Sequence, residues 1–140
     1  GRCDAFGTDA SLLAGMRAAL PNARDWVILD ETFSKEPYGA YLRRGDEDWF
    51  ELVRWYTYAL IEAEEQGITR ANVEEQRRTA TNPSTRRLLG VTPELGQSIK
   101  LDPAWVVNAV RAIGNYGELY ERTMGEQTPV GLPRGPNNLW

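Results

Sequence analysis

The sequence has no histidine, a single cysteine and no long apolar run, and each absence excludes a class of function. Without His, a serine–histidine–aspartate triad and a Cys/His zinc site are both excluded within these 140 residues. Cys3 is the single cysteine and cannot form an intrachain disulfide. No apolar run approaches the ~20 residues that a membrane-spanning helix needs. We therefore expect no enzymatic activity, no metal site and no cofactor.

The residues that are present describe an ordinary folded domain. Hydrophobic residues make up 41% of the chain, and five Trp and six Tyr argue against disorder, because such side chains bury large areas when a core forms. The 16 basic and 20 acidic residues leave a net charge of −4. Since nucleic-acid binding depends on basic surfaces, we expect no nucleic-acid partner.

The sequence predicts about three short strands near its start. They are residues 3–8, in which small and polar residues alternate, the apolar run at residues 26–29, and residues 40–43. No hairpin turn joins them, and so few strands rarely form a sheet alone. The three strands therefore indicate that other parts of a sheet lie outside this chain.

Five to six helices are predicted from apolar periodicity and from capping residues. The clearest runs from Asp46 to about Gln66, and Gly67 ends it. The other predicted helices begin at Asp9 or Ser11 (ending near Leu20), at Thr69, at Asn82-Pro83, at Thr92-Pro93, and at Asp102-Pro103, the last being a long helix that ends at Gly125. The predicted fold class is α/β with a helix-rich second half.

Asp9 has the strongest case for a chemical role. It follows a predicted strand and precedes a predicted helix, and ligands of open α/β folds bind at such an edge. The same position is also that of an ordinary helix N-cap. The hydroxyl of Thr8 beside it suits either a ligand or a neighbour within a sheet. The residues alone leave both interpretations open.

Several motifs, in order along the chain, resemble the general L-amino-acid-binding periplasmic proteins of polar amino-acid ABC transporters. The first spans residues 1–11 and includes Asp4-Ala5-Phe6-Gly7-Thr8-Asp9. The others span residues 28–39, 44–50, 82–90, 114–117 and 131–135. The resemblance runs from end to end, and the number of motifs in sequence makes it specific.

This resemblance implies the C-terminal part of a type II periplasmic binding protein, whose two α/β lobes close over one amino acid. Residues 1–34 would form the end of lobe two, residues 35–39 a hinge crossing, and residues 40–140 the C-terminal part of lobe one with a helical extension. The resemblance also implies a periplasmic location, although no signal peptide is visible at the start of the sequence.

The resemblance also implies roles for site residues. It assigns Asp9 to the ammonium group of a bound amino acid, with which a buried carboxylate forms a charge-assisted pair, and it makes Thr8 a weaker candidate. The groups that hold the ligand's α-carboxylate would lie in a part of the family's chain that is absent here. So would a disulfide partner for Cys3, which is otherwise a structural thiol. The departures from the family pattern are Gly7, Asp30 and Tyr38.

The sequence thus predicts a partial solute-binding component of an ABC importer for L-amino acids, carrying the ammonium-binding side of the site. As a separate chain it should bind an L-amino acid weakly or not at all. Its expected partners are the transporter permease, in the full-length protein, and either a second copy or a companion fragment that covers exposed apolar surface. The alternative is a stand-alone helical interaction protein that reuses this segment.

Overall fold

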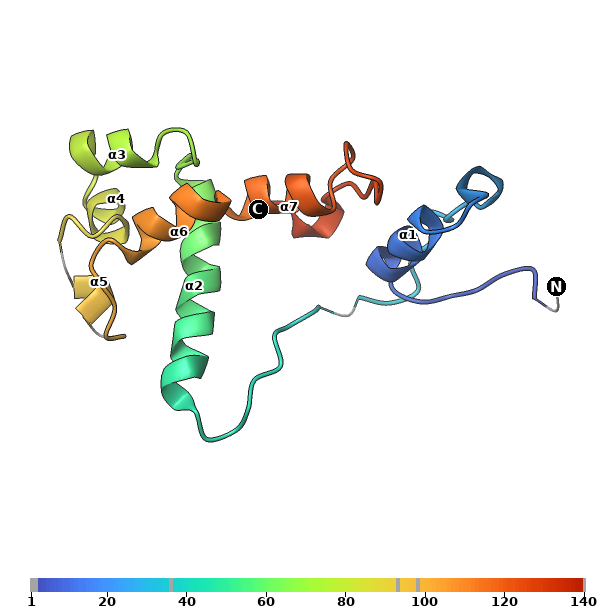
Figure 1. Cartoon of the computed structure of the whole chain (residues 1–140), viewed down its shortest axis with the longest axis horizontal. Coiled ribbons are helices and arrows are strands. Elements are labelled where there is room, and N and C mark those ends of the chain that lie inside the picture. The colour runs from blue at the N-terminus through green and yellow to red at the C-terminus, as the bar shows by residue number, and fades with distance from the viewer. Residues whose placement is uncertain (1–2, 36, 93, 98, 140) are drawn as a thin grey trace. The chain divides into compact units, whose positions relative to one another are not determined.

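The computed structural model describes residues 3–35, 37–92, 94–97 and 99–139. Within these ranges the α-helices are α1 (Ala10–Ala18), α2 (Glu47–Glu65), α3 (Val73–Thr79), α4 (Pro83–Leu88), α5 (Glu94–Gln97), α6 (Trp105–Ile113) and α7 (Tyr116–Thr123), and the short 3-10 helices are η1 (Ala23–Asp25) and η2 (Gly135–Asn137) (Figure 1). Contacts divide the chain into two compact units, Gly1–Gly39 with Tyr120–Asn138, and Ala40–Leu119 with Leu139–Trp140.

The described residues contain no β-strand, so the predicted α/β class with about three short strands is wrong for this chain. Residues 3–8, 26–29 and 40–43 are irregular. A strand is stable when a neighbouring strand exchanges backbone hydrogen bonds with it, and these described segments form no such ladder with one another. The helix-rich character predicted for the second half is confirmed.

The core of the second unit forms where α6 crosses α2 and packs beside α3 (Figure 1). The buried side chains from α6 and its neighbours are Ala59, Leu60, Ala63, Ile68, Val73, Leu88, Leu89, Trp105, Val106, Val107, Ala109 and Val110. Burying a side chain of Val or Leu size contributes about 1.5–3 kcal/mol. This cluster therefore supplies most of the stability of the second unit, and α2 contributes to it only through its second half.

Helix α2 begins and ends close to the predicted residues. The Asp46 carboxylate accepts a hydrogen bond from the backbone N–H of Trp49 at 3.1 Å, so Asp46 is the N-cap. At the other end, the chain turns through Gly67 in a left-handed conformation. At 19 residues α2 is long, but no helix in the described part of the chain is both long and apolar enough to cross a bilayer.

The predicted last long helix is two helices, because the chain breaks at Gly114. Gly114 has φ +84° and ψ −179°, a conformation open to glycine and costly for other residues. Asn115 then caps α7, since its side-chain oxygen accepts from the N–H of Glu118 at 2.8 Å while the Glu118 carboxylate accepts from the N–H of Asn115 at 3.0 Å. This reciprocal capping box starts a new helix instead of continuing the old one.

The starts of α3 and α4 differ in how well the sequence predicts them. Asn82 caps α4 by accepting from the N–H of Ser84 at 2.9 Å, as predicted. Thr69 does not cap α3; instead its N–H donates to the side chain of Asn72 at 2.7 Å, three residues later. Of the predicted start at Thr92-Pro93, Pro93 lies outside the described residues, as does Glu36 in the predicted hinge crossing.

In the first unit, the C-terminal tail folds back on the end of α7. The Tyr120 hydroxyl donates to the carbonyl of Pro133 at 3.2 Å, and the N–H of Leu132 donates to the carbonyl of Met124 at 2.9 Å. The Arg134 guanidinium lies over the Tyr120 ring at 5.8 Å from its centroid. Hydrogen bonds and a cation–π contact therefore hold the described part of the tail against the end of α7.

Helix α1, also in the first unit, shows its apolar residues to solvent. Leu12 and Met16 in the helix, and Leu20 just after it, are 40–49% exposed, whereas Ala14 is buried. The sequence predicts that the three large residues, with Leu13, share one apolar face. An apolar helix face of this kind is stable in water only when another element covers most of it. The described residues of this chain therefore cover the apolar face of α1 only in part.

Candidate functional site

Asp9 lies directly before the first residue of α1, at the N-cap position. Its backbone is extended, with φ −58° and ψ 140°, and its carbonyl accepts the hydrogen bond from the N–H of Leu13 at 2.9 Å. The Asp9 carboxylate, however, accepts no hydrogen bond from the first turn of the helix. Asp9 therefore occupies the N-cap position, but its side chain does not cap the helix.

Asp9 is half-buried, and no hydrogen bond or ion pair links its carboxylate to any other described residue. An ionised carboxylate accepts hydrogen bonds only, through two oxygens with about four lone-pair sites. Withdrawing it partly from water without a protein partner has a cost, which a cationic ligand would offset. The geometry therefore leaves Asp9 available to a donor from outside this chain.

Three residues with hydroxyl groups lie in the same unit as Asp9. Thr8 precedes Asp9 and is exposed. Ser11, in the first turn of α1, donates a long hydrogen bond of 3.5 Å to the hydroxyl of Tyr38. The candidate site thus consists of Asp9 with the hydroxyls of Thr8, Ser11 and Tyr38, all within the first unit. Such a set provides several oxygen acceptors for an ammonium group.

The sequence does not predict the hydrogen bond between Ser11 and Tyr38. Tyr38 stands out in the sequence only as a departure from the family pattern, and it lies 27 residues from Ser11. Helical spacing links Asp9 to Ser11, because both fall at the start of one helix. No local signal links either residue to Tyr38, since a contact across so many residues depends on the fold.

The remaining candidates carry no chemistry of their own. Cys3 is exposed and unpaired. Among the described residues, no three or more Cys, Asp or Glu side chains come together in a group that could hold a metal ion. The ion pair of Lys100 with Asp48, at 2.7 Å, is largely solvated and contributes little to stability.

Known proteins match the chain along its whole length. The glutamate/glutamine/aspartate/asparagine-binding protein BztA of Rhodobacter capsulatus is 51% identical over 140 residues. The general L-amino acid-binding periplasmic protein AapJ of Rhizobium johnstonii is 44% identical over 142 residues. No protein-family profile matches the chain.

A solved structure gives the same result. An ABC transporter periplasmic binding protein from Brucella ovis, with glutathione bound, matches all of this chain with a TM-score of 0.92 at 48% identity. This chain is homologous to amino-acid ABC transporter binding proteins. The resemblance inferred from the motifs is thereby confirmed.

The match covers only part of each relative. The chain spans 41% of the length of BztA and of AapJ, and 44% of the Brucella ovis chain. BztA and AapJ are named as amino-acid-binding proteins, and the Brucella ovis structure as an ABC transporter periplasmic binding protein.

Proposed function

We propose that this chain supplies the ammonium-binding side of an α-amino-acid site in the solute-binding component of an ABC importer. One observation carries the proposal. Asp9 is half-buried at the start of α1, and its carboxylate has no partner among the described residues, in a chain homologous to amino-acid-binding proteins. An α-ammonium group has three N–H donors and a full positive charge, and it matches this acceptor.

The two ends of an amino-acid ligand need different protein groups. An amino-acid zwitterion needs acceptors at one end and cationic or N–H donors at the other. Asp9, with Thr8 as a further candidate, provides acceptors. The donors for the α-carboxylate belong, in this proposal, to the part of the protein that corresponds to the unmatched length of the relatives. Residues 1–34 are then the end of one lobe, 35–39 a hinge crossing, and 40–140 part of the other lobe.

The ligands in the relatives' names share this chemistry. BztA is named for four amino acids, and the Brucella ovis structure holds glutathione. Glutathione keeps a free α-ammonium and α-carboxylate on its γ-glutamyl residue, so one ammonium-binding group could serve every ligand in this set. The protein would act in the periplasm, deliver its ligand to a membrane permease and catalyse no reaction.

The test uses a full-length chimera in which these 140 residues replace the matching part of BztA. Calorimetry with glutamate, glutamine, aspartate and asparagine identifies its best ligand. Asp9→Asn keeps the size of the side chain but removes its charge, so we expect affinity to fall by about 2–5 kcal/mol, roughly 30-fold or more. Asp4→Asn, at an exposed carboxylate five residues earlier, is the matched control. Equal affinities for the two variants would overturn the role of Asp9.

A further inference from the structure

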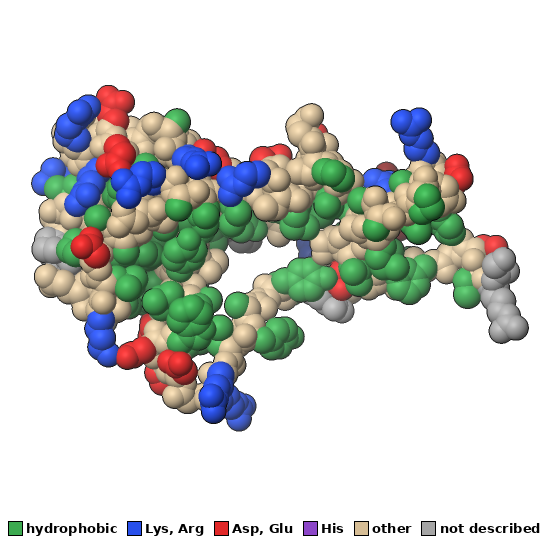
Figure 2. Space-filling model, in the orientation of Figure 1, with side chains coloured by type: hydrophobic (Ala, Val, Ile, Leu, Met, Phe, Trp, Pro, Cys, Tyr) green, Lys and Arg blue, Asp and Glu red, His purple; other side chains and the backbone are tan. Residues whose placement is uncertain are grey.

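From Trp49 to Tyr58, α2 carries four large aromatic side chains that remain exposed. Trp49, Phe50, Trp55 and Tyr58 are 49%, 44%, 37% and 54% exposed, and we call these four residues the aromatic segment of α2. In Figure 2, hydrophobic side chains gather along this part of the helix. The end of α2 after Tyr58 is different, because Ala59, Leu60 and Ala63 are buried in the core that α2 shares with α6. The same helix is thus buried at its end and partly uncovered before it.

The four aromatic side chains lie around the helix and not along one stripe. At 3.6 residues per turn, Phe50, Tyr58 and Trp55 point about 100°, 180° and 240° away from the direction of Trp49. A helix that is hydrophobic all round is a buried helix. A single partner helix packs along one stripe only. Whatever covers the aromatic segment therefore contacts α2 from more than one side.

The charges within this surface are already neutralised. Glu51 accepts from the Arg54 guanidinium at 2.6 Å and from the Trp55 indole N–H at 2.9 Å. The same guanidinium lies 5.5 Å from the ring centroids of both Phe50 and Trp55. These contacts order the side chains in advance, which lowers the entropy cost of burying them. Between Trp49 and Tyr58 the charged side chains are therefore paired and preorganised, as they should be on a surface that becomes buried.

We propose that the aromatic segment of α2 is an interface, and that the part of the protein corresponding to the unmatched length of the relatives buries it. More than half of each relative lies outside the match, which leaves a polypeptide of domain size to cover it. A second copy of this chain fits the aromatic segment less well. A two-fold dimer would contact α2 through a single patch on each partner, whereas the segment needs cover from more than one side. The proposal concerns assembly and does not depend on amino-acid binding.

The experiment compares the 140-residue chain with the BztA chimera by hydroxyl-radical footprinting, without ligand. We expect Trp49, Phe50, Trp55 and Tyr58 to be labelled strongly in the chain alone and several-fold less in the chimera. Exposed Glu65, at the end of the same helix, provides a control position. Tyr58→Lys places a charge in the interface and should lower the Tm of the chimera by roughly 5 °C or more, whereas Glu65→Lys should change it by no more than about 2 °C.

Two results would overturn the proposal. One is unchanged labelling of the aromatic segment in the chimera. The other is protection of the segment in the 140-residue chain together with a dimer mass by light scattering, which would make a second copy the occupant. The interface can also be tested without a folded chimera, by coexpressing the chain with the unmatched part of BztA as a separate polypeptide. Co-purification that Tyr58→Lys abolishes supports the interface, and absence of co-purification, or co-purification that the variant leaves unchanged, contradicts it.

Discussion

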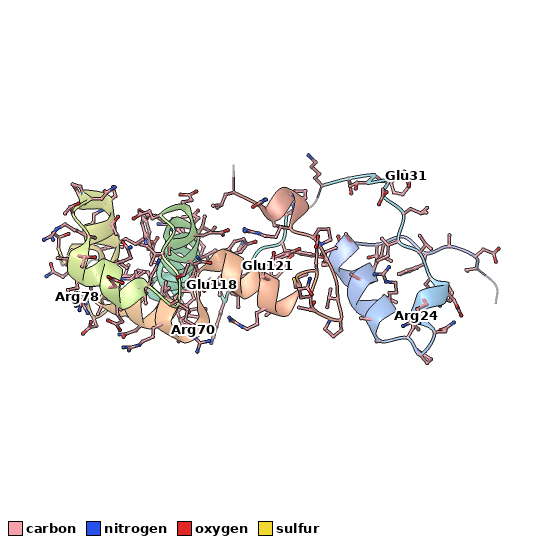
Figure 3. The ribbon with its side chains drawn as sticks, turned by 90° about the horizontal axis from the view of Figure 1, so that it is seen from above. Arg24, Glu31, Arg70, Arg78, Glu118 and Glu121 are labelled. Atoms are coloured by element: carbon pink, nitrogen blue, oxygen red, sulfur yellow. The ribbon has the colours of Figure 1, made fainter. Side chains whose placement is uncertain are left out.

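Asn115 joins two parts of the second unit that are far apart in the sequence. Its side chain is 4% exposed, and its amide donates to the carbonyl of Ile68 at 2.9 Å while its oxygen caps α7. The carboxylate of Glu118 adds a second link by accepting from the N–H of Arg70 at 2.9 Å, and Figure 3 shows the two labelled residues near one another. Asn115 thus satisfies backbone groups on both segments at once.

Asn115→Ala should lower the free energy of unfolding by about 2–4 kcal/mol, because it removes a helix cap and leaves a buried carbonyl without its donor. Urea denaturation measures the loss. Asn108→Ala is the matched control, since the Asn108 side chain is exposed and only accepts from Arg111 on the surface of α6; we expect a change within about 0.5 kcal/mol. Similar losses for both variants would contradict a structural role for Asn115.

Gly90 and Gly67 share a left-handed backbone but differ in their surroundings. Their φ angles are +67° and +65°. A Cβ at Gly67 meets nothing within 4 Å, whereas one at Gly90 would overlap the carbonyl group of Pro103. Gly67→Ala should therefore cost about 1–2 kcal/mol, for backbone strain alone. Gly90→Ala should cost about 3 kcal/mol or more, because the chain before α6 must also move. Chemical denaturation of the two variants compares them, and equal losses would contradict the close approach.

At the scale of elements, α2 depends on its N-cap. Asp46 accepts from the N–H of Trp49, and Glu47 and Asp48 place further negative charge at the helix N-terminus. Asp46→Ala should destabilise the protein by about 1 kcal/mol and reduce helicity, whereas Asp46→Asn should be nearly neutral because Asn caps almost as well. Thermal unfolding followed by circular dichroism separates the two. A neutral Asp46→Ala would show that the cap is not needed.

Local chemistry made some elements predictable and others not. The ends of α2 and the start of α4 follow from Asp46, Gly67 and Asn82-Pro83, whose capping propensities act within a few residues. The break between α6 and α7 could not be predicted in this way. Apolar periodicity continues across it, and the capping box of Asn115 with Glu118 is stabilised by contacts with the distant residues Ile68 and Arg70.

At the scale of the whole molecule, the sequence predicted strands that this chain does not form. Residues 26–29 have the composition of a buried strand, yet Trp26, Val27 and Leu29 are 48–80% exposed. The apolar composition of a segment indicates that it is suited to burial in a sheet. A strand also needs a neighbouring strand whose backbone N–H and C=O groups are free to pair with its own. The relatives are longer than this chain, and that other parts of a sheet lie in their additional length stays a prediction.

The candidate site was predictable only in part. Asp9 followed from its place before a helix and from the family resemblance, and its ligand-binding role remains a prediction. The structure adds that its carboxylate does not cap α1, which weakens the purely structural interpretation. The approach of Tyr38 to Ser11 could not have been found from sequence, because the two residues are 27 positions apart and their contact depends on the fold. Exposed apolar surface was expected, but the sequence did not predict which residues of α1 and α2 would form it.

Calorimetric titration of the separate 140-residue chain tests the central claim most directly. The ligand is the amino acid that the BztA chimera binds best, and the chimera is the positive control. If the chain carries only the ammonium-binding side of the site, it should bind that amino acid at least about 100-fold more weakly than the chimera, because the partners of the α-carboxylate are missing. Micromolar binding by the separate chain, unchanged by Asp9→Asn, would contradict the account.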